Sequence, residues 1–183
     1  KGMVPKREFY NIVAQFLDNL AKKNTENNGI CNLGMWNGKE IVYMVQSAND
    51  KYMLLTVGST VPAYCSALGK AVLAYLPDEA LENYIQRTEF VTFTESTVNS
   101  AERLRADLQA VREKGYALMD DELYPGLKGL AMPVINGSAP VRYAVSVTQT
   151  IYGPAGQLVE QMLKPLQETV QDIVACMEIH AGQ

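Results

Sequence analysis

The stretch GYALMDDELYPGLKGLAMPVINGSAPVRYAVSVT, residues 115–148, decides the fold of this chain. It contains three short apolar runs with strand character, at residues 116–120, 130–135 and 142–148. Turn-forming residues separate the runs, with Pro-Gly after the first and NGSAP between the second and the third. Strands joined by short connections pair antiparallel. This part of the chain is therefore expected to form a hairpin-like group of strands.

A second group of strands is expected nearer the N-terminus. Three runs of β-type residues cover 30–36, 40–46 and 52–57. The first two flank Asn37-Gly38, and an Asn-Gly pair between two strands is a strong hairpin signal.

Apolar residues at helical spacing fill much of the remainder. They predict helices over residues 6–24, 62–75, 79–86 and 158–177, with Pro165 expected to kink or divide the last one. A further helix is expected to open at a capping box formed by Asn99 and Glu102 and to close at Lys114-Gly115. Two strand groups separated by helices favour an α+β fold with a mostly antiparallel sheet flanked by helices.

Composition narrows the class of protein. The chain has 183 residues, a length typical of one domain, and 20 acidic against 16 basic residues give a net charge of -4. This balance argues against a nucleic-acid-binding surface on the chain itself. The three cysteines are widely spaced, which favours reduced thiols and a cytoplasmic location, and no apolar run is long enough to span a membrane. We expect residues 1–183 to form a single domain with no metal and no cofactor.

Two kinds of chemistry are suggested by the segment YCSALGKAVLAYL, residues 64–76. Its Gly69-Lys70 pair does not fit a phosphate-binding loop, because Ala71 stands where a hydroxyl residue is required and no glycine stands five positions before Gly69. Cys65 could be a nucleophile at a helix start, but the chain has one histidine, His180, close to its C-terminus. A Cys65-dependent hydrolase is therefore the least favoured alternative, and no catalytic residue is expected.

Two polar features remain as candidates for a binding site. Asp120, Asp121 and Glu122 are either solvated turn residues or part of a functional site, and they lack the spacing of a calcium loop. In the strand VRYAVSVT, alternation places Val141, Tyr143, Val145 and Val147 on one face. Ser146 and Thr148 then project from the other face, roughly 7 Å apart, which suits the wall of a small-molecule site. An ordinary half-exposed strand is the alternative.

Three segments in this order, VPAYCSALGKAVLAYLPDEALENYI, REKGYALMDDELYPGLKGLAMPVI and APVRYAVSVT, resemble the C-terminal regulatory domain of IclR-type transcriptional regulators. The resemblance covers about residues 8–178. It implies a GAF- or PAS-like sensor domain, with helices on the convex face of a curved sheet and a small-molecule pocket on the concave face. It also implies an N-terminal winged helix-turn-helix, absent from this chain, that binds operator DNA, and assembly into homodimers or homotetramers.

The resemblance also implies which residues contact the effector. They are Cys65, Ser66, Ala67 and Gly69 at the helix start, Asp120 in the acidic turn, Gly129, and the strand residues Ser146 and Thr148. The chain departs from the family pattern at Gly129, where many members have cysteine, and at Met119, where an acidic residue is common. The expected effector is a small carboxylate or sugar acid. The remaining alternative is an oligomerisation module that binds no effector.

Overall fold

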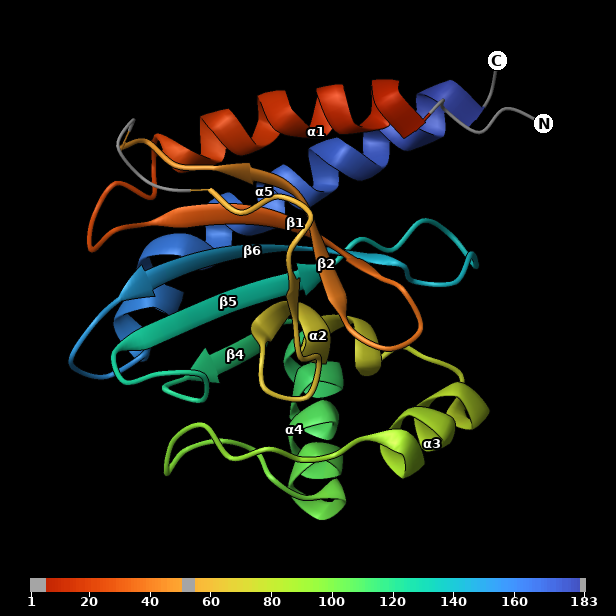
Figure 1. The fold of residues 1–183 in the computed structure, drawn as a ribbon. Helices are drawn as coiled ribbons and strands as arrows, with labels where there is room; N and C mark the ends of the chain where they lie inside the picture. Colours follow the sequence, from red (N-terminus) through yellow and green to blue (C-terminus); the bar gives the residue numbers. More distant parts are fainter. Residues whose placement is uncertain (1–5, 51–54, 182–183) are drawn as a thin grey trace.

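The computed structural model describes residues 6–50 and 55–181, which form a six-stranded sheet and five helices (Figure 1). Every paired neighbour is antiparallel, and the strand order is β3-β2-β1-β6-β5-β4. The strands are β1 (Ile30–Trp36), β2 (Ile41–Ser47), β3 (Thr60–Val61), β4 (Ala117–Asp120), β5 (Leu127–Pro133) and β6 (Tyr143–Thr150). The predicted α+β class with a mostly antiparallel sheet is confirmed.

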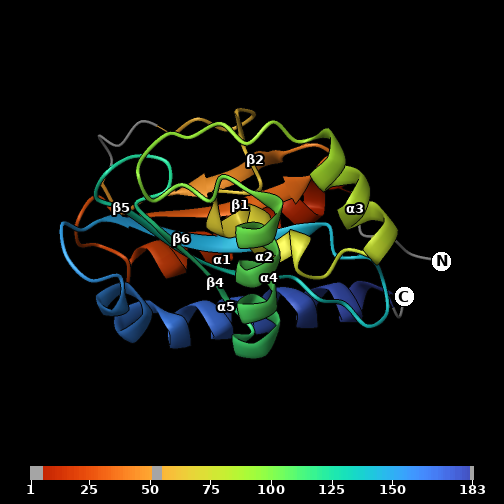
Figure 2. The same ribbon diagram turned by 90° about the horizontal axis from the view of Figure 1, so that it is seen from below.

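The helices divide between the two faces of the curled sheet. On one face, α1 (Lys6–Ala21) and α5 (Gly156–Ala181) lie side by side, as Figure 1 shows in red and blue. On the other face, α2 (Ala67–Leu73) packs against β4, β5 and β6, and α4 (Ala101–Lys114) packs on α2. Helix α3 (Asp78–Arg87) lies at the side of this second layer (Figure 2). We call these surfaces of the sheet the α1/α5 face and the α2 face.

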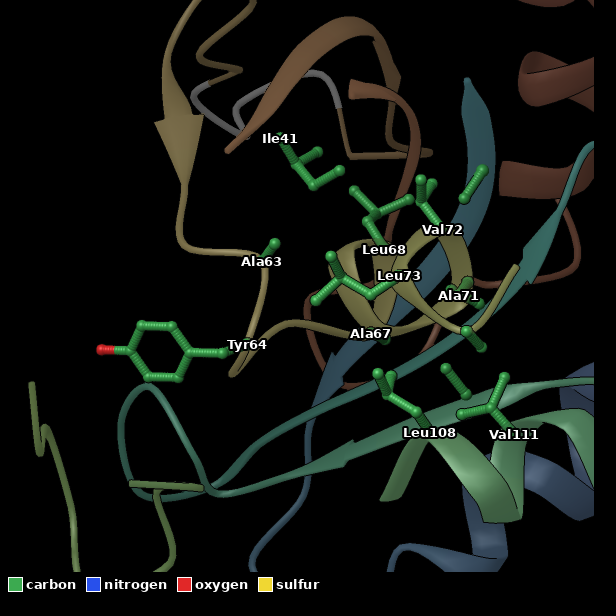
Figure 3. Close-up of a cluster of buried hydrophobic side chains, with 14 of the residues drawn as sticks. Ile41, Ala63, Tyr64, Ala67, Leu68, Ala71, Val72, Leu73, Leu108 and Val111 are labelled. Carbon is green, nitrogen blue, oxygen red and sulfur yellow. The ribbon is translucent and has the colours of Figure 1, made fainter. Parts of the chain in front are cut away.

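Each face has its own apolar core. Val13 and Leu17 of α1 and Leu158 of α5 are fully buried with Val145 and Val147 on the α1/α5 face. On the α2 face, side chains of α2 and α4 are buried with Ile41 of β2 and Ala144 of β6. Figure 3 shows Leu68 and Val72 of α2 directed towards Ile41, with Leu108 and Val111 of α4 below them. The central strands β1, β5 and β6 are therefore largely buried on both faces.

Local signals set the element boundaries. The Asn37-Gly38 turn forms as predicted, with Gly38 at φ +94° and the Asn37 N–H donating to the Glu40 carbonyl oxygen. Gly115 ends α4 in the left-handed conformation, as predicted. The predicted start of that helix is wrong by one residue, because Ser100, not Asn99, is the N-cap and accepts a hydrogen bond from the Arg103 N–H.

Three other boundaries differ from the sequence-based expectation. The helix expected over 62–75 begins only at Ala67, because Ser66 caps it. The strand expected over 52–57 is not found at residues 55–57, residues 52–54 of it lie outside the described residues, and the edge strand is Thr60–Val61. Helix α5 continues through Pro165 undivided. Within residues 6–50 and 55–181, no helix is both long enough and apolar enough to cross a membrane.

Candidate functional site

The two faces of strand β6 differ as the alternation predicts. Val145 and Val147 are buried in the core of the α1/α5 face, whereas Ser146 lies on the α2 face and is only 1% exposed. Thr148 projects on the same side as Ser146. The prediction is wrong for Val141, which packs in the core of the α2 face, because β6 begins only at Tyr143 and strand alternation does not extend back to Val141.

Three predicted site residues and a neighbouring methionine meet where α2 covers β5: Ala67, Gly129, Thr148 and Met119. A Cβ atom placed on Gly129 would lie 3.3 Å from the Ala67 Cβ, 3.4 Å from the Met119 Cε and 3.6 Å from the Thr148 Cγ2. Met119, Gly129 and Thr148 are also register partners across β4, β5 and β6. The structure therefore brings together Ala67, Gly129 and Thr148, which lie far apart in the sequence. The Cβ atom of any side chain at position 129 would fit only if Ala67 yielded by a few tenths of an ångström.

Ser66 and Gly69 shape the start of α2. The Ser66 Oγ donates to the Pro62 carbonyl oxygen at 2.8 Å and accepts from the Gly69 N–H at 3.1 Å. A Cβ atom on Gly69 would lie 2.2 Å from both the Cα and the carbonyl oxygen of Ala63, so this glycine permits close backbone packing. The polar groups of both residues are already engaged, and their role in the geometry is to hold Ala67 against the sheet.

Cys65 lacks the lowered pKa that a nucleophilic thiol requires. Its side chain is fully buried, and burial raises the pKa of the thiol to about 12, with the Glu122 carboxylate adding to the effect and the Lys70 ammonium opposing it. A thiol with such a pKa is protonated at neutral pH, whereas a nucleophilic cysteine requires a lowered pKa. The side chain of His180 lies outside the described residues. Cys65 therefore packs beside the site as a small buried residue.

The acidic turn is split between the two faces of the sheet. In β4, Met119 is buried on the α2 face, so Asp120 projects towards the α1/α5 face. There the Lys128 Nζ donates to the Asp120 Oδ1 at 2.5 Å and to the Asp121 Oδ1 at 2.6 Å. Asp120 therefore does not share a face with Ser146 and Thr148, and the structure does not bring it to the predicted site. The alternation of β4 about Met119 was the signal for this placement.

Glu122 is the acidic residue that reaches the α2 layer. Its side chain is 6% exposed, and its Oε2 accepts from the Lys70 Nζ at 2.6 Å. The same Nζ donates to the Asp107 Oδ2 of α4 at 2.7 Å. Burial raises the pKa of the Glu122 carboxyl, and the Lys70 ammonium works against that shift. Lys70 is thus a buried ion-paired residue that ties α2 to both α4 and the turn after β4.

Two functional candidates were missed by the sequence reasoning, Asn32 of β1 and Gln46 of β2. Asn32 is 4% exposed and is the register partner of both Ser146 and Gln46. The Gln46 Nε2 donates to the Asn32 Oδ1 at 2.6 Å, and the Asn32 Nδ2 lies 3.5 Å from the Ser146 Oγ. The signal available in the sequence was a single amide inside the apolar run ICNLGMW. A polar side chain buried in a strand usually serves a specific partner.

A separate groove of about 560 Å³ lies beyond Tyr64. It is lined by the turn at Gly38–Glu40, by Tyr64 and Tyr84, and by the segment from Arg87 to Phe93. None of the eight predicted site residues lines it. The groove is therefore a rival location for a ligand and not an extension of the predicted site.

Comparison with known proteins gives matches in sequence and in structure. The chain is 31% identical over 138 residues to the Pca regulon regulatory protein of Pseudomonas putida, covering 74% of this chain and 47% of that protein. The C-terminal domain of the Escherichia coli regulator KdgR superposes with a TM-score of 0.77 at 25% identity, covering 93% of this chain and 96% of that one. The chain spans about half the length of the full-length regulators that it matches.

A third relative is a domain described as an inducer-binding domain. The domain of the transcription factor PobR from Acinetobacter, as a double mutant in complex with 3-hydroxybenzoic acid, superposes with a TM-score of 0.79 at 22% identity, covering 90% of this chain and 97% of that one. The family model described as the C-terminal part of the bacterial transcriptional regulator IclR matches residues 2–175. The chain therefore belongs to the IclR family of bacterial transcriptional regulators, as a C-terminal domain of that family.

Proposed function

We propose that this domain binds a small organic effector between α2 and the sheet, and that binding changes the operator affinity of a longer regulator. The observation that carries the proposal is the pair of hydroxyl residues Ser146 and Thr148 on the α2 face, beside the small residues Ala67 and Gly129. Hydroxyl groups on a largely apolar wall orient a small ligand.

The hydrogen bonds of these hydroxyls support the proposal. The Thr148 Oγ1 lies 3.4 Å from the Ile30 carbonyl oxygen, and the Ser146 Oγ lies 3.5 Å from the Asn32 Nδ2. Both distances are long for hydrogen bonds. Hydroxyl groups with weak partners gain from a ligand that offers better ones.

Family membership supports a carboxylate or a sugar acid as the effector. The 3-hydroxybenzoic acid bound by the PobR domain is a suitable first probe. Among the predicted contacts, we retain Ala67, Gly129, Ser146 and Thr148 as ligand-facing residues. We assign Cys65, Ser66 and Gly69 to shaping the site, and we leave Asp120 out because it projects from the other face.

The same proposal places the DNA-binding part outside this chain. The net charge of -4 supports a partner domain, expected to be a winged helix-turn-helix, as the operator-binding part. The regulator would act in the cytoplasm as a homodimer or homotetramer. Effector binding alters DNA affinity only if the two conformations of the regulator bind the effector unequally.

A thermal-shift screen of the purified domain against small organic acids and sugar acids tests the proposal. At least one compound should raise the midpoint, because a ligand that binds only the folded state stabilises it. The rise should be lost in a Ser146→Ala, Thr148→Ala double variant and kept in Ser138→Ala, which removes an exposed hydroxyl in the β5–β6 connection. If no compound in a broad set stabilises the wild type, an oligomerisation module without effector becomes the better account.

A further inference from the structure

A row of five side chains crosses the sheet on the α2 face. Register pairs Ala117 with Ala131, Ala131 with Ser146, Ser146 with Asn32, and Asn32 with Gln46. The row is apolar and small at the β4–β5 end and polar at the β6–β1–β2 end. No member of the row carries a charge.

The hydrogen bonds at the polar end of the row all run in one direction. The Thr56 N–H donates to the Gln46 Oε1 at 2.5 Å, the Gln46 Nε2 donates to the Asn32 Oδ1 at 2.6 Å, and the Asn32 Nδ2 points to the Ser146 Oγ at 3.5 Å. Each of these donors thus points along the row towards Ser146. Among residues 6–50 and 55–181, no acceptor is found for the hydroxyl hydrogen of Ser146, although the residue is 1% exposed.

A buried donor without an acceptor is unfavourable, so the Ser146 hydroxyl favours a ligand that brings an acceptor. The charge of that acceptor matters. A carboxylate buried at this end would face two amides and a hydroxyl with no cation among their hydrogen-bond partners, and an unpaired buried charge is costly. A hydroxyl or carbonyl oxygen has no such cost.

A hydroxyl group fits better than a carbonyl. It can accept from the Ser146 hydroxyl and donate to the second lone pair of the Asn32 Oδ1, since a carbonyl oxygen accepts two hydrogen bonds. We infer that Asn32, positioned by Gln46, is a specificity-determining residue of the effector site and selects an uncharged hydroxyl group of the effector. The inference rests on the proposed function, and it identifies the effector as a hydroxylated compound whose carboxylate, if it has one, binds away from this row.

Paired probes test the inference. Isothermal titration compares 3-hydroxybenzoate with benzoate, and gluconate with hexanoate, on the wild type, Asn32→Leu and Gln46→Met. Gln157→Met is the matched control, because Gln157 is exposed on α5 and its side chain takes no part in the site. The wild type should bind the hydroxylated member of at least one pair about tenfold more tightly or better, the scale of one or two well-made hydrogen bonds.

In Asn32→Leu this preference should fall to about twofold or less, mainly through weaker binding of the hydroxylated probe. Gln46→Met should give a preference for the hydroxylated probe between those of the wild type and Asn32→Leu, because Asn32 stays present but loses the hydrogen bond from Gln46. Gln46 is only partly buried, so this variant decides the question if Asn32→Leu does not fold. A preference that both variants retain would overturn the inference while the proposed function stands. The same holds if the wild type binds both members of each pair equally. Failure of every probe and of the wider screen to bind the wild type would overturn both.

Discussion

Replacing Gly69 with alanine tests how closely α2 is held against the chain that leads into it. The added Cβ would lie 2.2 Å from the Ala63 Cα, 2.2 Å from its carbonyl oxygen and 2.5 Å from its carbonyl carbon. All three are backbone atoms, so no side-chain rotation relieves the contact. Overpacking of this kind costs about 3 kcal/mol, and alanine recovers about 1 kcal/mol of helix propensity. The net loss in the free energy of unfolding should be about 2 kcal/mol.

Urea unfolding followed by circular dichroism measures this loss, and a domain of this size should melt roughly 4–8 °C lower. Gly156→Ala is the control, because Gly156 also lies in a helix but has no neighbouring atom within 4 Å of where an added Cβ would stand. That variant should be as stable as the wild type or slightly more stable. A Gly69→Ala protein of unchanged or higher stability would refute the close approach of α2 to Ala63, and with it the packing that holds Ala67 over Gly129.

Three further predictions concern buried and ion-paired groups. Lys70→Met should destabilise the domain by about 3–5 kcal/mol, because it leaves the Glu122 carboxylate buried without its cation, and adding Glu122→Gln should restore most of the loss in a denaturant titration. Alkylation of the native protein at mildly alkaline pH, followed by mass spectrometry, should modify Cys176 well before Cys65, because the Cys65 thiol is buried and has a pKa of about 12. Equal rates of alkylation at the two cysteines would contradict the burial of Cys65. The hydrogen bond from Lys128 lowers the pKa of the Asp121 carboxyl. The ionised carboxylate of Asp121 therefore stabilises the folded domain above the pKa that it has in the unfolded chain, and this contribution is lost as the pH falls through the pKa of the folded state. Asp121→Asn should remove this loss of stability at acidic pH, which is worth less than about 1 kcal/mol. If thermal melts of the variant at acidic pH matched those of the wild type, the pairing would be refuted.

Strand periodicity predicted the part of the site that lies on β6. Alternation in VRYAVSVT was sufficient to place Ser146 and Thr148 on one face and Val145 and Val147 on the other, because a strand has a fixed period of two. The class of fold followed from the order of the strand groups and helices in the same way.

Features that depend on distant partners could not be predicted from local pattern. Lys70 is fully buried only because Asp107 and Glu122, 37 and 52 residues away, meet its ammonium group. The sequence does not show whether Gly69 makes room for a ligand or for the Ala63 backbone. In both cases the contact that decides the role of the residue is made by tertiary packing, which the local sequence pattern does not show.

The placement of polar residues on the sheet shows the same limit. Asp120 was assigned to the site from the resemblance, although the alternation of β4 about Met119 turns it to the α1/α5 face. Asn32 was overlooked because one amide in an apolar run gives no sign of its partner until β1 is paired with β6.

The most direct test of the account is a crystal structure of the domain with the compound that stabilises it most. The account predicts that the compound lies between Ala67 of α2 and the sheet, against Ser146 and Thr148, with an uncharged oxygen within hydrogen-bond distance of the Ser146 hydroxyl. A compound bound instead in the groove beyond Tyr64, with Ser146 and Thr148 untouched, would contradict it.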